Sequence, residues 1–141
     1  MIRLAAAALT AILFGGSFAA NADVYKVTRV IDGDTVEIAV DFLPQPLPPK
    51  LSIRVLGVDT PEKAPRALCD SEAKRALAAS AFTKQVVSEA KEIDIQIKSW
   101  DKYGGRVLGY VILDGKSLTD LLIENGHARP YKGEKKSSWC E

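Results

Sequence analysis

Short segments with β-branched residues and alternating apolar and polar positions recur along the chain, a pattern typical of half-buried β-strands. Asp32-Gly33, between the first two segments, is a dipeptide suited to a tight hairpin turn. We therefore predict five strands, in this order: Val24–Ile31, Thr35–Val40, Leu51–Val55, Ile93–Lys98 and Arg106–Leu113.

After Asp70 the spacing of apolar residues changes to that of a helix. Asp70 or Ser71 is expected to cap this helix, which should run to about Ala90 with Glu72 in its first turn. Its apolar positions fall on one face and are predicted to be buried: Ala73, Leu77, Ala81 and Phe82.

A second, shorter helix is predicted near the end of the chain. Ser117 and Asp120 resemble a capping box at its start, and Asn125-Gly126 is suited to its end. Asp41–Lys50 contains four prolines, which lack the donor that a central strand needs, so this segment is expected to be an exposed loop. The order β-β-β-α-β-β-α matches a five-stranded oligonucleotide/oligosaccharide-binding (OB) barrel, an α+β, mainly β fold.

The first residues have the organisation of a secretory signal peptide. A positive Met1–Arg3 precedes the apolar stretch Leu4–Phe14, and Ala20-Asn21-Ala22 fits a signal-peptidase site. The apolar stretch is shorter than the about 20 residues that span a bilayer, which makes a retained anchor the weaker alternative. Cleavage after residue 22 would leave residues 23–141 as one domain, exported to the periplasm or secreted.

Composition places the rest of the chain among ordinary globular domains. Hydrophobic residues make up 47% and charged residues 26% of the sequence. Removal of Arg3 with the signal peptide leaves equal numbers of basic and acidic residues. A protein that coats DNA through bulk charge would be far more basic, so any nucleic-acid contact must come from a local cluster.

Cys69 and Cys140 are the two cysteines of the chain. In an exported protein the expected arrangement is a disulfide, which would contribute about 4 kcal/mol on the chain-entropy model. Two free thiols or a metal pair are the alternatives, although the separation matches no zinc motif.

Carboxylates and arginines lie near the ends of the predicted strands. Each has an ordinary structural explanation: Asp32-Gly33-Asp34 as a turn, Thr60-Pro61-Glu62 as a strand exit, and the arginines as solvated surface. Their combination suggests chemistry, and the candidates are Asp34, Arg54, Asp59, Glu62 and Arg106.

Asp34 and Asp59, with a backbone carbonyl near Thr60, would supply the hard oxygen ligands that Ca²⁺ prefers. The single His127 and the widely separated cysteines argue against zinc. Glu62, three residues after Asp59, could act as a general base beside such a metal. Two arginines aimed at the same place could hold a phosphoryl group bidentately.

At these residues the chain resembles the staphylococcal-nuclease-like thermonucleases. The resemblance covers nearly all of residues 27–131. The segments that carry it are Val30–Val36 (VIDGDTV), Ile53–Glu62 (IRVLGVDTPE), Ala79–Lys84 (ASAFTK), Asp101–Arg106 (DKYGGR) and Gly126–Ala128 (GHA).

The resemblance implies a Ca²⁺-dependent nuclease that cuts the 5′-oxygen–phosphorus bond of DNA and RNA, with low sequence specificity, and leaves 3′-phosphate ends. Asp34, Asp59 and the main-chain oxygen of Thr60 would bind the metal. Glu62 would activate water, and Arg54 and Arg106 would stabilise the transition state.

The resemblance also implies substrate contacts through Lys102, Tyr103 and Tyr131. Stacking on aromatic rings favours single strands or frayed ends. A monomer without a stable protein partner is expected.

The sequence departs from the family pattern before Arg106, where Gly104-Gly105 replaces a single glycine. A turn or bulge can absorb the insertion and leave Arg106 at the start of its strand, although Lys102 and Tyr103 could be displaced. The sequence ends ten residues after Tyr131, where longer family members add a further helix. We hypothesise that Trp139-Cys140, tied to Cys69, closes the core in its place.

Two other functions remain open from the sequence. One is a non-catalytic barrel that only binds nucleic acid or another polyanion, which the even charge balance favours. The other is a periplasmic or cell-wall scaffold that uses the proline-rich loop Pro44–Pro49. The combination of Glu62, Arg54 and Arg106 favours the enzyme, because a binding module does not need it. His127 matches no catalytic position and is interpreted as structural or incidental.

Overall fold

The computed structural model describes residues 25–140, so the predicted signal peptide, residues 1–22, lies outside the described residues. All five predicted strands are present in the described part, with small shifts of their ends. They are β1 (Lys26–Asp32), β2 (Thr35–Ala39), β3 (Lys50–Val55), β5 (Ile93–Trp100) and β6 (Arg106–Leu113).

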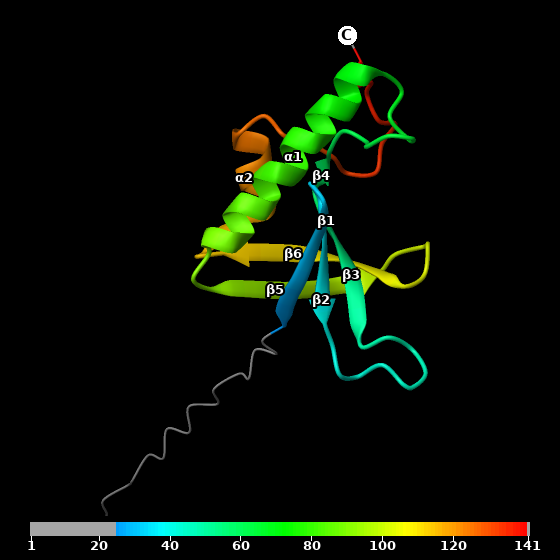
Figure 1. Cartoon of the computed structure of the whole chain (residues 1–141), viewed down its shortest axis with the longest axis vertical. Coiled ribbons are helices and arrows are strands. Elements are labelled where there is room, and N and C mark those ends of the chain that lie inside the picture. The colour runs from blue at the N-terminus through cyan, green and yellow to red at the C-terminus, as the bar shows by residue number, and fades with distance from the viewer. Residues whose placement is uncertain (1–24, 141) are drawn as a thin grey trace, which may run out of the picture.

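These strands form one sheet in the order β1-β2-β3-β6-β5, in which β3 and β6 pair in parallel and the other neighbours are antiparallel. This confirms the predicted OB-like α+β fold. In the described residues, however, β1 and β5 are the edges of the sheet, so the ladder of strands does not close into a complete barrel. Figure 1 shows α1 (Asp70–Glu89) crossing one end of the sheet, with α2 (Leu118–Glu124) beside it.

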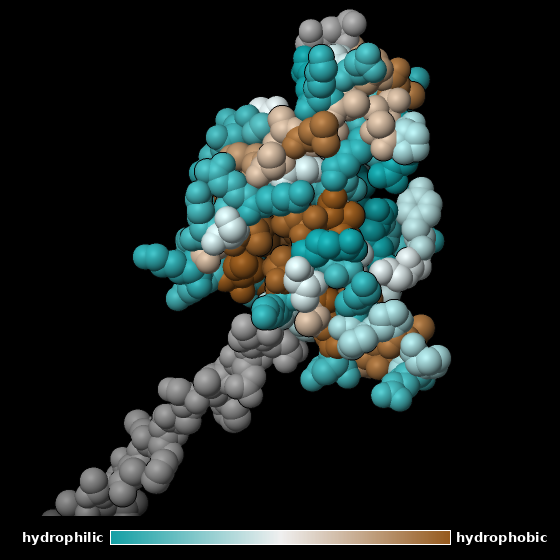
Figure 2. Space-filling model, in the orientation of Figure 1, coloured by the Kyte–Doolittle hydropathy of each residue, from teal (hydrophilic) through white to brown (hydrophobic). Residues whose placement is uncertain are grey.

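The core lies between the strands and the two helices. Side chains of β2, β3 and β6 that alternate toward the interior are fully buried, among them Val36, Ile38, Ile53 and Val111. Figure 2 shows apolar side chains gathered below α1, over β5 and β6, with polar side chains around them. Among residues 25–140, no helix combines the length and the apolar character needed to cross a membrane.

The first helix has the predicted length, but its start and its buried face differ from the prediction. Cys69 is the N-cap, and its sulfur accepts a hydrogen bond from the backbone N–H of Glu72 at 3.4 Å. Neither Asp70 nor Ser71 is the cap, because both belong to the helix itself.

Leu77 is 62% exposed, and the helix instead buries a narrow face of small and polar residues. Ala73 and Phe82 are half-buried, while Ala81 is exposed. The residues that the helix buries are Glu72, Ala76, Ala79, Ser80 and Thr83.

Gly33 explains why this face is made of small residues. A Cβ atom on Gly33 would lie 2.8 Å from Cβ of Ala79, closer than two side-chain carbons can approach. Thr83 Oγ1 donates to the carbonyl oxygen of Gly33 at 2.7 Å. The hairpin turn consists of Gly33 and Asp34, one residue later than predicted, and Gly33 does not have the positive φ that favours glycine. Glycine is therefore required by the contact with the helix and not by the turn.

The second helix forms as predicted. Ser117 is its N-cap and accepts a hydrogen bond from the backbone N–H of Asp120 at 3.0 Å, and Asn125 is its C-cap. The proline-rich segment is an exposed loop between β2 and β3, also as predicted.

Three short strands were not predicted: β4 (Val58–Asp59), β7 (Lys116–Ser117) and β8 (Arg129–Pro130). The antiparallel pairing of β4 with β8 brings the C-terminal segment beside Asp59. That segment ends at the expected disulfide, since Cys140 is bonded to Cys69 with Cα atoms 6.0 Å apart. Trp139, immediately before Cys140, is buried, in agreement with the hypothesis that these two residues close this side of the core.

We expect Gly33→Ala to lower the free energy of unfolding by about 1–3 kcal/mol, because the new methyl group cannot be accommodated without moving the helix. Urea unfolding would measure the change. The variant Gly33→Ala/Ala79→Gly, which removes the opposing methyl, should recover part of the loss relative to the sum of the single variants. Additive effects of the two substitutions would contradict the proposed contact.

Candidate active site

A cleft of about 800 Å³ opens over one face of the sheet. The ends of β1, β3 and β6, the loop after β4 and the C-terminal segment all contribute to its walls. The structure thus brings together residues that are far apart in the sequence. Six residues selected from the sequence line this cleft: Arg54, Glu62, Lys102, Tyr103, Arg106 and Tyr131.

The two arginines converge because of the parallel register of β3 and β6. Ser52 is opposite Arg106, and Arg54 is opposite Leu108, in that register. Ser52 and Arg54 point to the same face of β3, since side chains alternate along a strand. Arg106 shares the face of its partner Ser52, so both guanidinium groups reach the same cleft.

Each arginine has a carboxylate partner. Arg54 lies 3.3 Å from Oδ2 of Asp34, and Arg106 Nε donates to Oδ2 of Asp101 at 2.6 Å. Asp34 and Asp101 are both almost fully buried at the side chain. Asp101 was not selected from the sequence, although its position at the opposite end of the turn before Arg106 is the signal that could have identified it.

The turn before Arg106 accommodates the extra glycine. Gly104 and Gly105 have φ values of 56° and 65°, in the left-handed region that glycine adopts at low cost. The backbone N–H of Asp101 donates to the carbonyl oxygen of Arg106 at 3.0 Å and closes the turn. Arg106 therefore stands at the start of β6, as expected, and Lys102 and Tyr103 still line the cleft.

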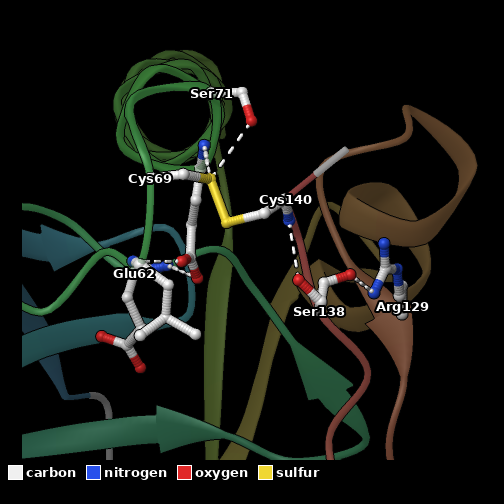
Figure 3. The surroundings of a disulfide bond; sticks show 8 residues. Glu62, Cys69, Ser71, Arg129, Ser138 and Cys140 are labelled. Atoms are coloured by element: carbon white, nitrogen blue, oxygen red, sulfur yellow. Dashed lines mark hydrogen bonds between the residues drawn. A yellow bond between two sulfur atoms is a disulfide. The ribbon is translucent and has the colours of Figure 1, made fainter.

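Glu62 lies on the loop that follows β4, and its side chain is 36% exposed. Its carboxylate forms an exposed ion pair with Arg66 at 3.1 Å, and such a pair contributes little to the stability of the fold. Figure 3 shows the Glu62 carboxylate pointing away from the disulfide.

Glu72 fixes the loop that carries Glu62. Its buried carboxylate accepts hydrogen bonds from the backbone N–H groups of Glu62 at 3.1 Å and Leu68 at 2.7 Å. The sequence indicated only that Glu72 would lie in the first turn of the helix. Its contact with a loop ten residues upstream could not be read from helical periodicity.

The three predicted metal ligands, Asp34, Asp59 and Thr60, do not line the cleft but are buried beside it. The segments that carry Asp34 and Thr60 are neighbours. A Cβ atom on Gly33, the residue before Asp34, would lie 3.5 Å from Cγ2 of Thr60. Asp59 uses both carboxylate oxygens: Lys136 Nζ lies 2.7 Å from Oδ1, and Trp139 Nε1 donates to Oδ2 at 3.0 Å.

These donors fit a hard divalent cation. A buried carboxylate requires a positive partner or several hydrogen bonds, and here Arg54 and Lys136 supply the charge. Carboxylate and main-chain oxygens are also the ligands of hard cations. A different grouping of possible ligands within residues 25–140, Cys69, Glu72 and Cys140, offers no thiolate, since its sulfurs are bonded to each other.

Aromatic rings next to cations form the rim of the cleft. Tyr103 is 69% exposed, and its ring lies 5.0 Å from Lys102 Nζ and 5.5 Å from the Arg106 guanidinium. The ring of Tyr131 likewise lies next to a cation, 5.5 Å from Lys136 Nζ. This arrangement can bind the flat face of a base and the neighbouring phosphate together.

Among residues 25–140, two groups outside the cleft have shifted pKa values. Burial acts to raise the pKa of Glu37, but hydrogen bonds and the charges of Lys50 and Arg29 outweigh it and lower the pKa. Burial lowers the pKa of His127, whose ring packs against Phe82. This contact agrees with the structural role expected for His127.

Residues 52–139 match the family model described as staphylococcal nuclease homologue. The thermonuclease of Staphylococcus hyicus is 40% identical over 114 residues, which are 78% of this chain and 60% of that protein. The thermonuclease of Staphylococcus intermedius is 36% identical over 107 residues, 74% of this chain and 58% of that protein. Endonuclease YncB of Bacillus subtilis is 37% identical over 105 residues, 72% of this chain and 44% of that protein. The chain therefore spans less than two thirds of the length of these relatives.

We expect Glu72→Gln to lower the free energy of unfolding by about 1–3 kcal/mol, because an amide NH₂ would face one of the two backbone N–H donors. Hydrogen exchange at the backbone amides of Glu62 and Leu68, followed by NMR, should become faster. Glu92→Gln, at an exposed glutamate outside the cleft, is the matched control. Unchanged protection of both amides would show that Glu72 does not hold this loop.

Proposed function

Because the chain belongs to the staphylococcal nuclease homologue family, we propose that it is a nuclease that hydrolyses DNA and RNA with low sequence specificity. The observation that carries the proposal is the convergence of Arg54, Arg106 and Glu62 on one cleft, beside two buried carboxylates. A protein that only binds a polyanion needs the cations but has no use for the carboxylate at this position.

The two arginines are proposed to hold the scissile phosphate. Arg54 and Arg106 approach from adjacent strands, and their pairing with Asp34 and Asp101 restricts the directions that the guanidinium groups can take. Guanidinium groups held in this way stabilise the charge that develops on the phosphoryl oxygens in the transition state, without reorganisation at the moment of reaction.

Glu62 is proposed to act as general base. It would take a proton from a water molecule as the water oxygen attacks phosphorus, and the bond from phosphorus to the 5′-oxygen would break, leaving a 3′-phosphate end. Its partner Arg66 is 69% exposed, so the ion pair can separate at little cost when substrate and water enter.

Ca²⁺ is the proposed cofactor, held by Asp34, Asp59 and the main-chain oxygen of Thr60, and when bound it would polarise the phosphate and offset negative charge. The burial of both carboxylates and their oxygen-only chemistry support this assignment.

The substrate is proposed to lie along the rim, with Lys102, Tyr103 and Tyr131 in contact with it. Stacking requires an accessible base, so single strands and frayed ends should be preferred. Export to the periplasm or beyond, after removal of residues 1–22, is part of the same proposal, as is a monomeric state. The disulfide supports export, because disulfides persist in oxidising compartments.

Purified protein should cut denatured DNA and RNA in the presence of Ca²⁺ and lose this activity when a chelator is added. Analysis of the product ends should find 3′-phosphates, which block extension by a polymerase until a phosphatase removes them. Readdition of Ca²⁺ should restore cleavage. Binding of DNA without cleavage under all of these conditions would favour the non-catalytic alternative.

Glu62→Gln should retain DNA binding but reduce the rate of cleavage by about 10²–10⁴-fold, the usual contribution of a positioned general base. Single-turnover cleavage and fluorescence anisotropy on the same labelled oligonucleotide would separate the two effects. Glu92→Gln, which makes the same chemical change outside the cleft, should cleave at the rate of the unmodified protein. Equal cleavage by Glu62→Gln would exclude Glu62 as the base.

A further inference from the structure

The C-terminal segment Lys136–Cys140 contacts Asp59 with two side chains of different chemistry. Trp139 donates an N–H to Oδ2, and Lys136 places its ammonium group against Oδ1. We propose that Trp139 is a positioning residue that orients Asp59 for a divalent cation, and that Lys136 competes with that cation for Oδ1. This inference rests on the proposed function, because it concerns the same metal ligand.

Trp139 is held rigidly enough to orient its partner. Its ring is buried, and the Arg129 guanidinium stacks on it at 3.8 Å. Arg129 is itself the strand partner of Asp59 and donates to the carbonyl oxygen of Ser138 at 2.7 Å. Cys140, which directly follows Trp139, is bonded to Cys69 at the start of α1. Figure 3 shows Arg129, Ser138 and Cys140 meeting at this point.

The two contacts should have opposite effects on a cation. An indole N–H is a neutral donor that accepts nothing, so it fixes Oδ2 and leaves the negative charge of Asp59 intact. The Lys136 ammonium group cancels that charge, and its side chain is 41% exposed and lines the cleft, so it can move aside. With Oδ2 held by Trp139, Oδ1 is the oxygen available to either cation.

Titration calorimetry with Ca²⁺ on the purified, disulfide-intact protein tests the inference. Trp139→Phe keeps a ring but removes the donor, and its dissociation constant for Ca²⁺ should rise at least tenfold. Lys136→Met removes the competing charge, and its dissociation constant should fall at least threefold. Trp100→Phe, at a 61% exposed tryptophan, and Lys91→Met, at an exposed lysine, are matched controls that should stay within twofold of the unmodified protein.

The outcomes separate this inference from the proposed function. If the unmodified protein binds Ca²⁺ and Trp139→Phe binds it equally well, the positioning role is wrong. An unchanged dissociation constant for Lys136→Met would exclude the competition. If the unmodified protein binds no Ca²⁺, the Ca²⁺ dependence in the proposed function fails, and the inference fails with it.

A spectroscopic measurement covers the case in which Trp139→Phe does not fold. The chain has two tryptophans, so in Trp100→Phe the single indole N–H resonance belongs to Trp139. Addition of Ca²⁺ should shift that resonance. The Trp139 N–H donates to Oδ2 of Asp59, and on the adjacent Oδ1 the divalent ion would replace the ammonium group of Lys136. A resonance that does not move at saturating Ca²⁺ would overturn the inference.

Discussion

Two carboxylates held almost entirely out of water, those of Asp34 and Asp59, impose the main constraint on this structure. Withdrawing a carboxylate from water costs free energy unless positive charge and hydrogen bonds replace the lost hydration. Arg54 provides this for Asp34, while Lys136 and Trp139 provide it for Asp59. The groups that compensate these charges therefore gather on one side of the sheet, where they also line the cleft or lie close to it.

The disulfide and the parallel pairing of β3 with β6 make this side of the sheet rigid. The register of β3 with β6 fixes the relative positions of the two arginines, and the turn before Arg106 absorbs an extra glycine without disturbing it. The bond between Cys69 and Cys140 joins the C-terminal segment to the first turn of α1. That turn also carries Glu72, which holds the loop of Glu62. One covalent link thus stabilises two walls of the cleft.

Much of the fold could be predicted because strands and helix caps depend on local sequence. The five long strands and the capping box at Ser117 follow from periodicity and side-chain hydrogen bonding over a few residues. The buried face of α1 could not be predicted in this way. The hydrophobic pattern predicted that Leu77 would be buried. In the structure the β1–β2 hairpin approaches α1 so closely at Gly33 that only small residues such as Ala79 fit between the hairpin and the helix.

The sequence by itself determined the order of the five long strands and the two helices, the cysteine pair, and the types of residue at each candidate position. Its motifs also named the individual residues of the candidate site, from Asp34 to Arg106. Only the tertiary structure decided that Trp139 and Lys136 bind opposite oxygens of Asp59, that Asp101 pairs with Arg106, and that Glu72 supports the loop of Glu62. The contacts of Asp59 join distant segments through strand pairing and a disulfide, whereas those of Asp101 and Glu72 depend on the shape of a turn and a loop. Neither kind of contact leaves a periodic signal in the chain.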